Sequence, residues 1–209
     1  GIGYHSNQWD LSLAAVNGGR GIRVNDSPER GKLNNLAANV SYKSTLHSEF
    51  CYRVGAGFLL GTIYDGFTAE HIDANQFGEN YNSAWNLNGR VDYGCVTLAG
   101  EFVSTTDPWP VTGSKVNALR AEAAYWVDRG RLPSFFSFSW SAGEQGPSGS
   151  EFEFNRQLVL GYSKQLSCRC RVSAEYVRSM GFAPLMNITT ASDRGVAQDS
   201  LVAGLTLVF

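Results

Sequence analysis

The stretch from Arg169 to Tyr176 reads RCRVSAEY and decides the fold class. One set of alternate positions holds Cys170, Val172, Ala174 and Tyr176, and the other holds Arg169, Arg171, Ser173 and Glu175. Successive side chains of a β-strand point to opposite sides, so this pattern predicts a strand with one apolar face and one polar face.

The same alternation recurs along the whole chain. It predicts strands at 8–16, 35–43, 50–63, 83–93, 95–105, 117–128, 135–142, 155–165, 169–176 and 199–209. These are about ten strands of about nine to twelve residues, the length that crosses a bilayer at a tilt and longer than most strands of soluble sheets. We therefore predict an all-β fold, an up-and-down antiparallel transmembrane β-barrel. Residues 1–209 would form it as a single domain or as part of a larger barrel.

The composition fits a membrane protein that crosses with strands. Charged residues make up 17% of the chain, below the usual share of a soluble domain. No run of about twenty apolar residues is present to form a spanning helix. The net charge of -2 and the lack of a basic run argue against a nucleic-acid partner. Residues 1–8 lack the features of a signal peptide, so we expect the numbering to start at a mature or trimmed end.

The predicted connections alternate between short and long. Short ones fall at 44–49, 94, 129–134 and 166–167, and long polar ones at 18–34, 64–82, 106–116, 143–154 and 180–198. Short turns on one side and long loops on the other are typical of outer-membrane barrels, whose short turns are periplasmic.

Aromatic residues are predicted near the strand ends, where they would form the interfacial belts that flank a lipid-facing band. They are Trp9, Tyr42, Tyr52, Trp85, Tyr93, Tyr125, Trp140, Tyr162 and Tyr176. The alternative is a soluble β-sandwich or lipocalin-like barrel, in which the apolar face would form a buried core.

Five segments carry three resemblances to known bacterial proteins. The last strand, LVAGLTLVF from Leu201 to Phe209, resembles the C-terminal signature of outer-membrane proteins that the barrel-assembly machinery reads. LGYSKQLS from Leu160, followed by VSAEYV from Val172, resembles the penultimate hairpin of Gram-negative porins. AGEFVSTTD from Ala99 and LRAEAAYWV from Leu119 resemble the C-terminal half of LbtU-like siderophore porins. That resemblance implies transport of ferric siderophores but assigns no ligand-binding residue.

Charged residues on the polar face are the candidate lining of a lumen. They are Arg53, Arg90, Asp92, Glu101, Arg120, Glu122, Arg169, Arg171 and Glu175. On neighbouring strands such residues can form a ladder of ion pairs, and rings of charge set the ion preference of a pore. Positive and negative charges nearly balance, so no strong selectivity is predicted. In a barrel of few strands, the same side chains would instead fill and close the lumen.

The four cysteines all fall near predicted periplasmic strand ends. Cys51 and Cys95 share the polar face and are the candidate disulfide, since the periplasm is oxidising. Cys168 and Cys170 form a C-x-C pair. Neither a C-x-x-C motif nor a nearby histidine suggests a metal or cofactor, so none is predicted.

Two other functional classes remain as alternatives. The loop residues Glu70, His71 and Asp73 are the candidate acid–histidine group of an outer-membrane hydrolase or of a loose divalent-cation site. The loop from Asp107 to Pro110 is the candidate contact of an adhesin-like or structural barrel.

The leading prediction is a porin-like, non-enzymatic channel of the bacterial outer membrane that passes small solutes or siderophores by diffusion. Its expected partners are outer-membrane lipid, the barrel-assembly machinery through Phe209, and the solutes themselves. Homo-oligomers are left open. The runner-up is a closed small barrel that acts as a structural or binding element.

Overall fold

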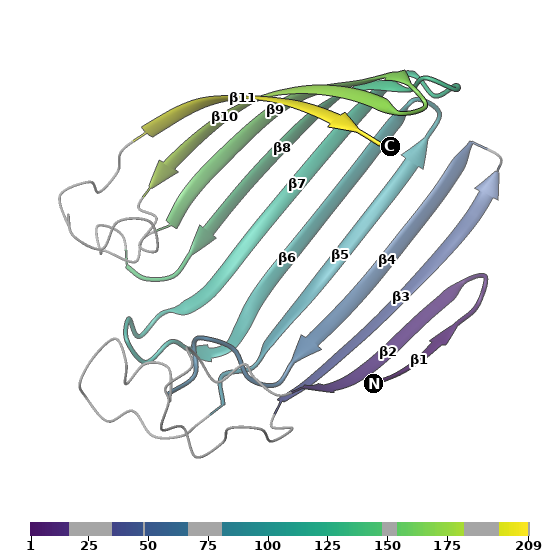
Figure 1. The fold of residues 1–209 in the computed structure, drawn as a ribbon. Helices are drawn as coiled ribbons and strands as arrows, with labels where there is room; N and C mark the ends of the chain where they lie inside the picture. Colours follow the sequence, from purple (N-terminus) through teal and green to yellow (C-terminus); the bar gives the residue numbers. More distant parts are fainter. Residues whose placement is uncertain (17–34, 48, 67–80, 148–153, 182–196, 209) are drawn as a thin grey trace.

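The computed structural model describes residues 1–16, 35–47, 49–66, 81–147, 154–181 and 197–208, and these form a single antiparallel sheet (Figure 1). Its strands are β1 (Ile2–His5), β2 (Trp9–Val16), β3 (Asn35–His47), β4 (Phe50–Leu59), β5 (Ala84–Tyr93), β6 (Val96–Pro108), β7 (Lys115–Asp128), β8 (Ser134–Glu144), β9 (Phe154–Ser167), β10 (Cys170–Gly181) and β11 (Ala197–Leu207). Each strand pairs with the next along the chain. The all-β, up-and-down prediction is confirmed, and β1 is an addition that the sequence did not predict. The described residues contain no helix able to cross a bilayer.

The sheet is open. The strand order runs from β1 to β11, and these two strands form its edges without pairing with each other (Figure 1). The prediction of a closed barrel is therefore wrong for this chain as it stands. The sheet curls strongly without its edge strands joining, so the hydrogen-bond ladder does not close.

Connections differ at the two ends of the sheet. Residues 6–8, 94–95, 129–133 and 168–169 form short turns at one end, while the strand ends that border the longer connections lie at the other (Figure 1). The two-residue turn between β5 and β6 uses Gly94 at φ 50°, a conformation that most side chains disfavour. The predicted separation of short turns from long loops is confirmed.

Strand register separates the side chains into two faces. One row that crosses the sheet from β4 to β11 consists of Tyr52, Val91, Leu98, Ala123, Phe138, Leu160, Tyr176 and Leu201. The adjacent row, on the opposite face, consists of Arg53, Arg90, Ala99, Glu122, Ser139, Val159, Val177 and Ser200. Side chains from β5 to β10 line a common cavity on the second face, so we call this the concave face and the other the convex face.

The described residues contain almost no buried apolar core. Trp109, at 3% exposed, is the only apolar side chain among them that is buried. Leu160 and Leu201 are 45% and 81% exposed in the middle of β9 and β11, and Leu98, near the start of β6, is 51% exposed. A soluble sandwich or lipocalin-like barrel would bury such residues between layers. The described part of the chain has one layer, which excludes that alternative there.

A belt of aromatic side chains follows the convex face at the short-turn end. Phe50 and Tyr93 are cross-strand partners with ring centroids 6.1 Å apart, and Phe136 and Tyr162 are partners at 4.8 Å. Tyr125 lies between them on the same row. The register row places Trp140 of β8 and Tyr176 of β10 within their strands, away from the short turns, so the prediction that they lie at strand ends is wrong.

At the opposite end, the connections after β4, β6 and β8 are tied together. Asn82 donates from Nδ2 to the carbonyl oxygens of Tyr64 and Asp107 at 3.1 and 3.0 Å, and its Oδ1 accepts from the Asp107 amide at 3.1 Å. The rings of Tyr64 and Trp109 pack edge to face at 5.2 Å. We call Tyr64, Asn82, Asp107, Trp109 and Gln145 the loop cluster. Trp109 is buried within the loop cluster. The Asp107–Pro110 segment, the candidate contact of an adhesin-like barrel, therefore does not expose this ring to a partner.

Candidate functional site: the concave face

The concave face carries a cavity of about 530 Å³, and half of the residues that line it are charged or carry a hydroxyl group. Arg90, Arg120, Glu122 and Glu175 contribute from β5, β7 and β10. Ser137, Ser139 and Ser141 lie between them because every second residue in this part of β8 is serine. The cavity is thus a product of the period-2 pattern and of the curl of the sheet.

Arg90 and Asp92 form the best-defined ion pair of this face. The Arg90 guanidinium donates from Nε and Nη2 to the two Asp92 oxygens at 2.8 and 2.9 Å. Asp92 Oδ1 also accepts from the Thr97 hydroxyl at 2.5 Å, and Thr97 Oγ1 accepts from Trp126 Nε1 at 3.2 Å. Three neighbouring strands are therefore joined by one polar chain, in which both carboxylate oxygens are engaged.

The predicted cross-strand ladder of ion pairs is not formed. The salt bridges on this part of the face run along a strand, from Arg90 to Asp92 and from Arg120 to Glu122. Glu101 lies opposite Arg120 in the register but accepts a hydrogen bond of 2.7 Å from Asn86 Nδ2. Residues i and i+2 of a strand share a face, so an arginine can reach along its own strand as readily as across.

A run of positive charges crosses the first part of the sheet. Lys43 lies directly opposite Arg53, and Arg53 directly opposite Arg90. Among the described residues, neither Lys43 nor Arg53 has an ion pair or side-chain hydrogen bond; Arg90 alone of the three does. We call Lys43, Arg53 and Arg90 the basic row.

An aromatic pair interrupts the polar lining near the short turns. Trp126 and Phe135 are cross-strand partners on the concave face with ring centroids 4.7 Å apart. Arg129 lies over the Trp126 ring at 5.4 Å, and Arg171 over the Phe135 ring at 5.6 Å. Alternation placed Trp126 on the polar face, but no sequence signal marked the pair as part of a site.

Of the three remaining residues predicted to line a lumen, two lie in a strand and one lies in a turn. Arg171 and Glu175 lie on the concave face of β10, where Arg171 Nε donates to Ser163 Oγ at 2.7 Å. Arg169 lies in the exposed turn before β10 and not within the strand, so its predicted place in the strand is wrong. The tight turn that joins β9 to β10 ends the regular alternation at that residue.

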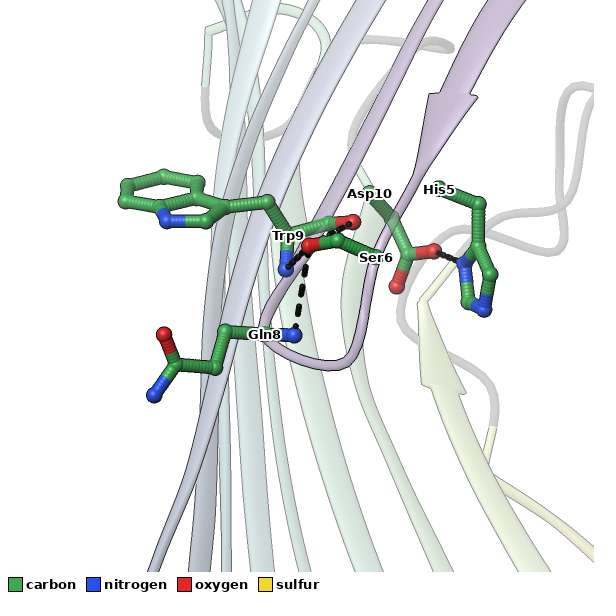
Figure 2. Close-up of polar contacts among 5 residues, drawn as sticks. All are labelled: His5, Ser6, Gln8, Trp9 and Asp10. Atoms are coloured by element: carbon green, nitrogen blue, oxygen red, sulfur yellow. Dashed lines mark hydrogen bonds and ion pairs between the residues drawn. The ribbon is translucent and has the colours of Figure 1, made fainter.

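His5 Nδ1 and Asp10 Oδ1 form a hydrogen bond across the β1–β2 hairpin (Figure 2). Ser6 stabilises the turn between them, since its Oγ accepts from the backbone nitrogens of Gln8 and Trp9 at 3.3 and 2.9 Å. In Figure 2, Trp9 points to one side of the hairpin while His5 and Asp10 lie on the other. The division into two faces therefore extends to the first hairpin. The sequence missed this pair because β1 has only four residues.

The predicted disulfide is not formed, since all four cysteines are free. Cys51 lies on the concave face opposite Asp92 and borders a smaller cavity with Arg90 and Arg129. Cys95 and Cys168 are exposed in short turns. Alternation gave Cys51 and Cys95 a common face, but Cys95 is a turn residue and has no strand face.

No family model, curated protein or solved structure matches the chain. Its function must therefore be inferred from its own residues.

Two predicted features lie outside the described residues: the Glu70, His71 and Asp73 group, and Phe209 with its link to barrel assembly. Within the described part of the chain, no cluster of three or more histidine, cysteine, aspartate or glutamate residues is arranged to hold a metal ion.

Proposed function

We propose that this sheet is part of the wall of a bacterial outer-membrane β-barrel, and that small polar solutes diffuse along its concave face. The observation that carries the proposal is the contrast between adjacent register rows. The convex row is apolar or aromatic at every strand from β4 to β11, whereas the concave face holds the Arg90–Asp92 and Arg120–Glu122 ion pairs and the cavity.

Exposing the side chains of the convex row to water would cost free energy. Moving a side chain the size of Leu or Phe out of water contributes about 1.5–3 kcal/mol. Soluble monomers rarely expose contiguous apolar patches larger than a few hundred Å². Hydrocarbon removes this cost, and the aromatic belt at the short-turn end is what an interface between lipid and water favours.

Lipid also imposes a condition on the two edges. An open edge leaves backbone amides and carbonyls without partners, which hydrocarbon does not tolerate. With eleven strands in sequence, β1 and β11 run in the same direction. Direct pairing would therefore be parallel, whereas one further strand between them would be antiparallel to both. The proposal requires that these edges be paired in the membrane.

Passive passage is favoured over catalysis by the chemistry of the concave face. Its charges are mostly engaged in ion pairs along a strand or in hydrogen bonds between strands, and a polar, paired lining suits a water-filled path. Siderophores remain among the candidate solutes only through the sequence resemblance.

Planar-bilayer recording tests the proposal. Protein refolded into lipid, with its strand content verified by circular dichroism, is expected to give discrete ohmic current steps. Glu122→Gln should change the unit conductance because it lines the cavity, while Arg156→Gln, on the convex side of β9, should leave it within experimental error. Folded, inserted protein that never conducts would refute the channel and support the closed structural barrel.

A further inference from the structure

We propose that the basic row binds the oxyanion group of a solute, such as a phosphate, sulfate or carboxylate. The inference names a substrate class for the proposed channel, and it rests on that proposed function for the delivery of solutes to the concave face. The binding itself depends only on the residues described next.

The register brings three like charges together. Directly opposed residues of antiparallel strands have Cβ atoms about 4.5–5.5 Å apart, and like charges in such positions destabilise a sheet. Lys43, Arg53 and Arg90 occupy such positions on three successive strands. A bound anion would offset this repulsion.

The protein's own carboxylates neutralise only part of the row. Asp92 pairs with Arg90 and also accepts from Thr97, whereas no described carboxylate forms an ion pair with Lys43 or Arg53. Asp10 is hydrogen bonded to His5 and acts on Lys43 and Arg53 only from beyond ion-pair distance. Further along the sheet, Glu101 accepts from Asn86 and Glu122 pairs with Arg120, as described above. Arg53 and Lys43 are thus left with the donors needed for an external oxyanion.

The surroundings of Arg53 provide room and additional donors. A cavity of about 200 Å³ is bordered by Arg53, Asn88 and Arg90, with Glu101 and Glu122 on its far side. A water occupies about 30 Å³ in the liquid, so an oxyanion with several waters fits. The planar guanidinium of Arg53 can present two parallel N–H groups to such an anion, which is the strongest common mode of oxyanion recognition.

Isothermal titration with inorganic phosphate tests the site on the full chain folded in a phosphate-free maltoside detergent at constant ionic strength. Wild type is expected to bind phosphate, Arg53→Gln to weaken binding about tenfold, and Lys43→Gln to weaken it by a smaller factor. Arg156→Gln is the matched control: it removes one positive charge from the convex side and should change affinity less than about twofold.

Absence of phosphate binding by folded wild type would overturn the inference. So would binding that Arg53→Gln leaves unchanged, or that Arg156→Gln weakens equally, because each points to general charge attraction. Since binding is measured without a conductance readout, the two proposals fail separately. Folded protein that binds phosphate but gives no current would refute the channel alone. Folded protein that conducts but does not bind phosphate would refute the oxyanion site alone.

Discussion

Gln145 donates a hydrogen bond of 3.0 Å from Nε2 to the Tyr64 hydroxyl, which links the end of β8 to the connection after β4 across 81 positions of sequence. Tyr64→Phe leaves this donor without its partner, so we expect the free energy of unfolding to fall by about 1 kcal/mol. Gln145→Ala should cost a similar amount, and the double variant should cost less than the sum. Denaturant unfolding in micelles measures all three.

Tyr125→Phe is the control for that series, since this exposed tyrosine of the aromatic belt has no hydrogen bond among the described side chains. Strict additivity of the two loop-cluster variants would contradict a direct contact between Tyr64 and Gln145.

The loop cluster should also weaken at alkaline pH. Burial raises the pKa of Tyr64 above its ordinary value, with the Gln145 hydrogen bond acting in the opposite direction. A group with a raised folded pKa contributes stability below its unfolded pKa, about 10 for tyrosine, and this stability is lost as pH rises through the folded value. The stability gap between wild type and Tyr64→Phe should therefore shrink above about pH 10. A gap that widens there would contradict the buried, neutral hydroxyl.

Asp92→Asn should tighten phosphate binding at the basic row. The substitution removes the carboxylate that holds Arg90 through two hydrogen bonds, which frees a third cation next to Arg53. We expect affinity to rise about threefold to tenfold in the titration described above. Glu175→Gln, on β10, removes one negative charge of the same face at a distance and serves as the control. Equal effects of both variants would indicate net charge alone.

The cysteines should titrate as four thiols in the denatured chain, because none is paired in the structure. In the folded protein, the exposed Cys95 and Cys168 should react with a water-soluble thiol reagent before Cys51 and Cys170, which are partly buried. A total near two thiols after denaturation without reductant would mean that a disulfide forms after all.

Much of the sheet was predictable from the sequence because a period of two is a backbone property. All ten predicted strands are present, with changes at their ends. β1 was missed since its four residues are too few for periodicity to register, and Arg169 was misplaced because alternation continues into a turn. Whether the sheet closes into a barrel was not predictable either, because pairing of the two edge strands depends on contacts between strands that are far apart in sequence.

The sequence predicted which residues share the face of the candidate site, but not which of them contact one another. Alternation placed Arg90, Asp92 and Glu122 on one side, which the register confirms. It cannot tell whether Arg90 reaches along β5 or across to β6, because both neighbours lie within reach of its side chain. The basic row needed the exact register of β3, β4 and β5, which no local pattern encodes.

Fluorescence quenching in liposomes tests the central claim most directly. Leu160 of β9 and Ser139 of β8 lie at nearly the same height but on opposite faces, since Ser139 is the partner of Val159. Each is replaced by cysteine in a chain whose native cysteines are serine, and labelled with a small fluorophore. Our account predicts that a nitroxide on the lipid acyl chains quenches the probe at 160, and that aqueous iodide quenches the probe at 139. Iodide quenching at 160 with lipid quenching at 139 would contradict it.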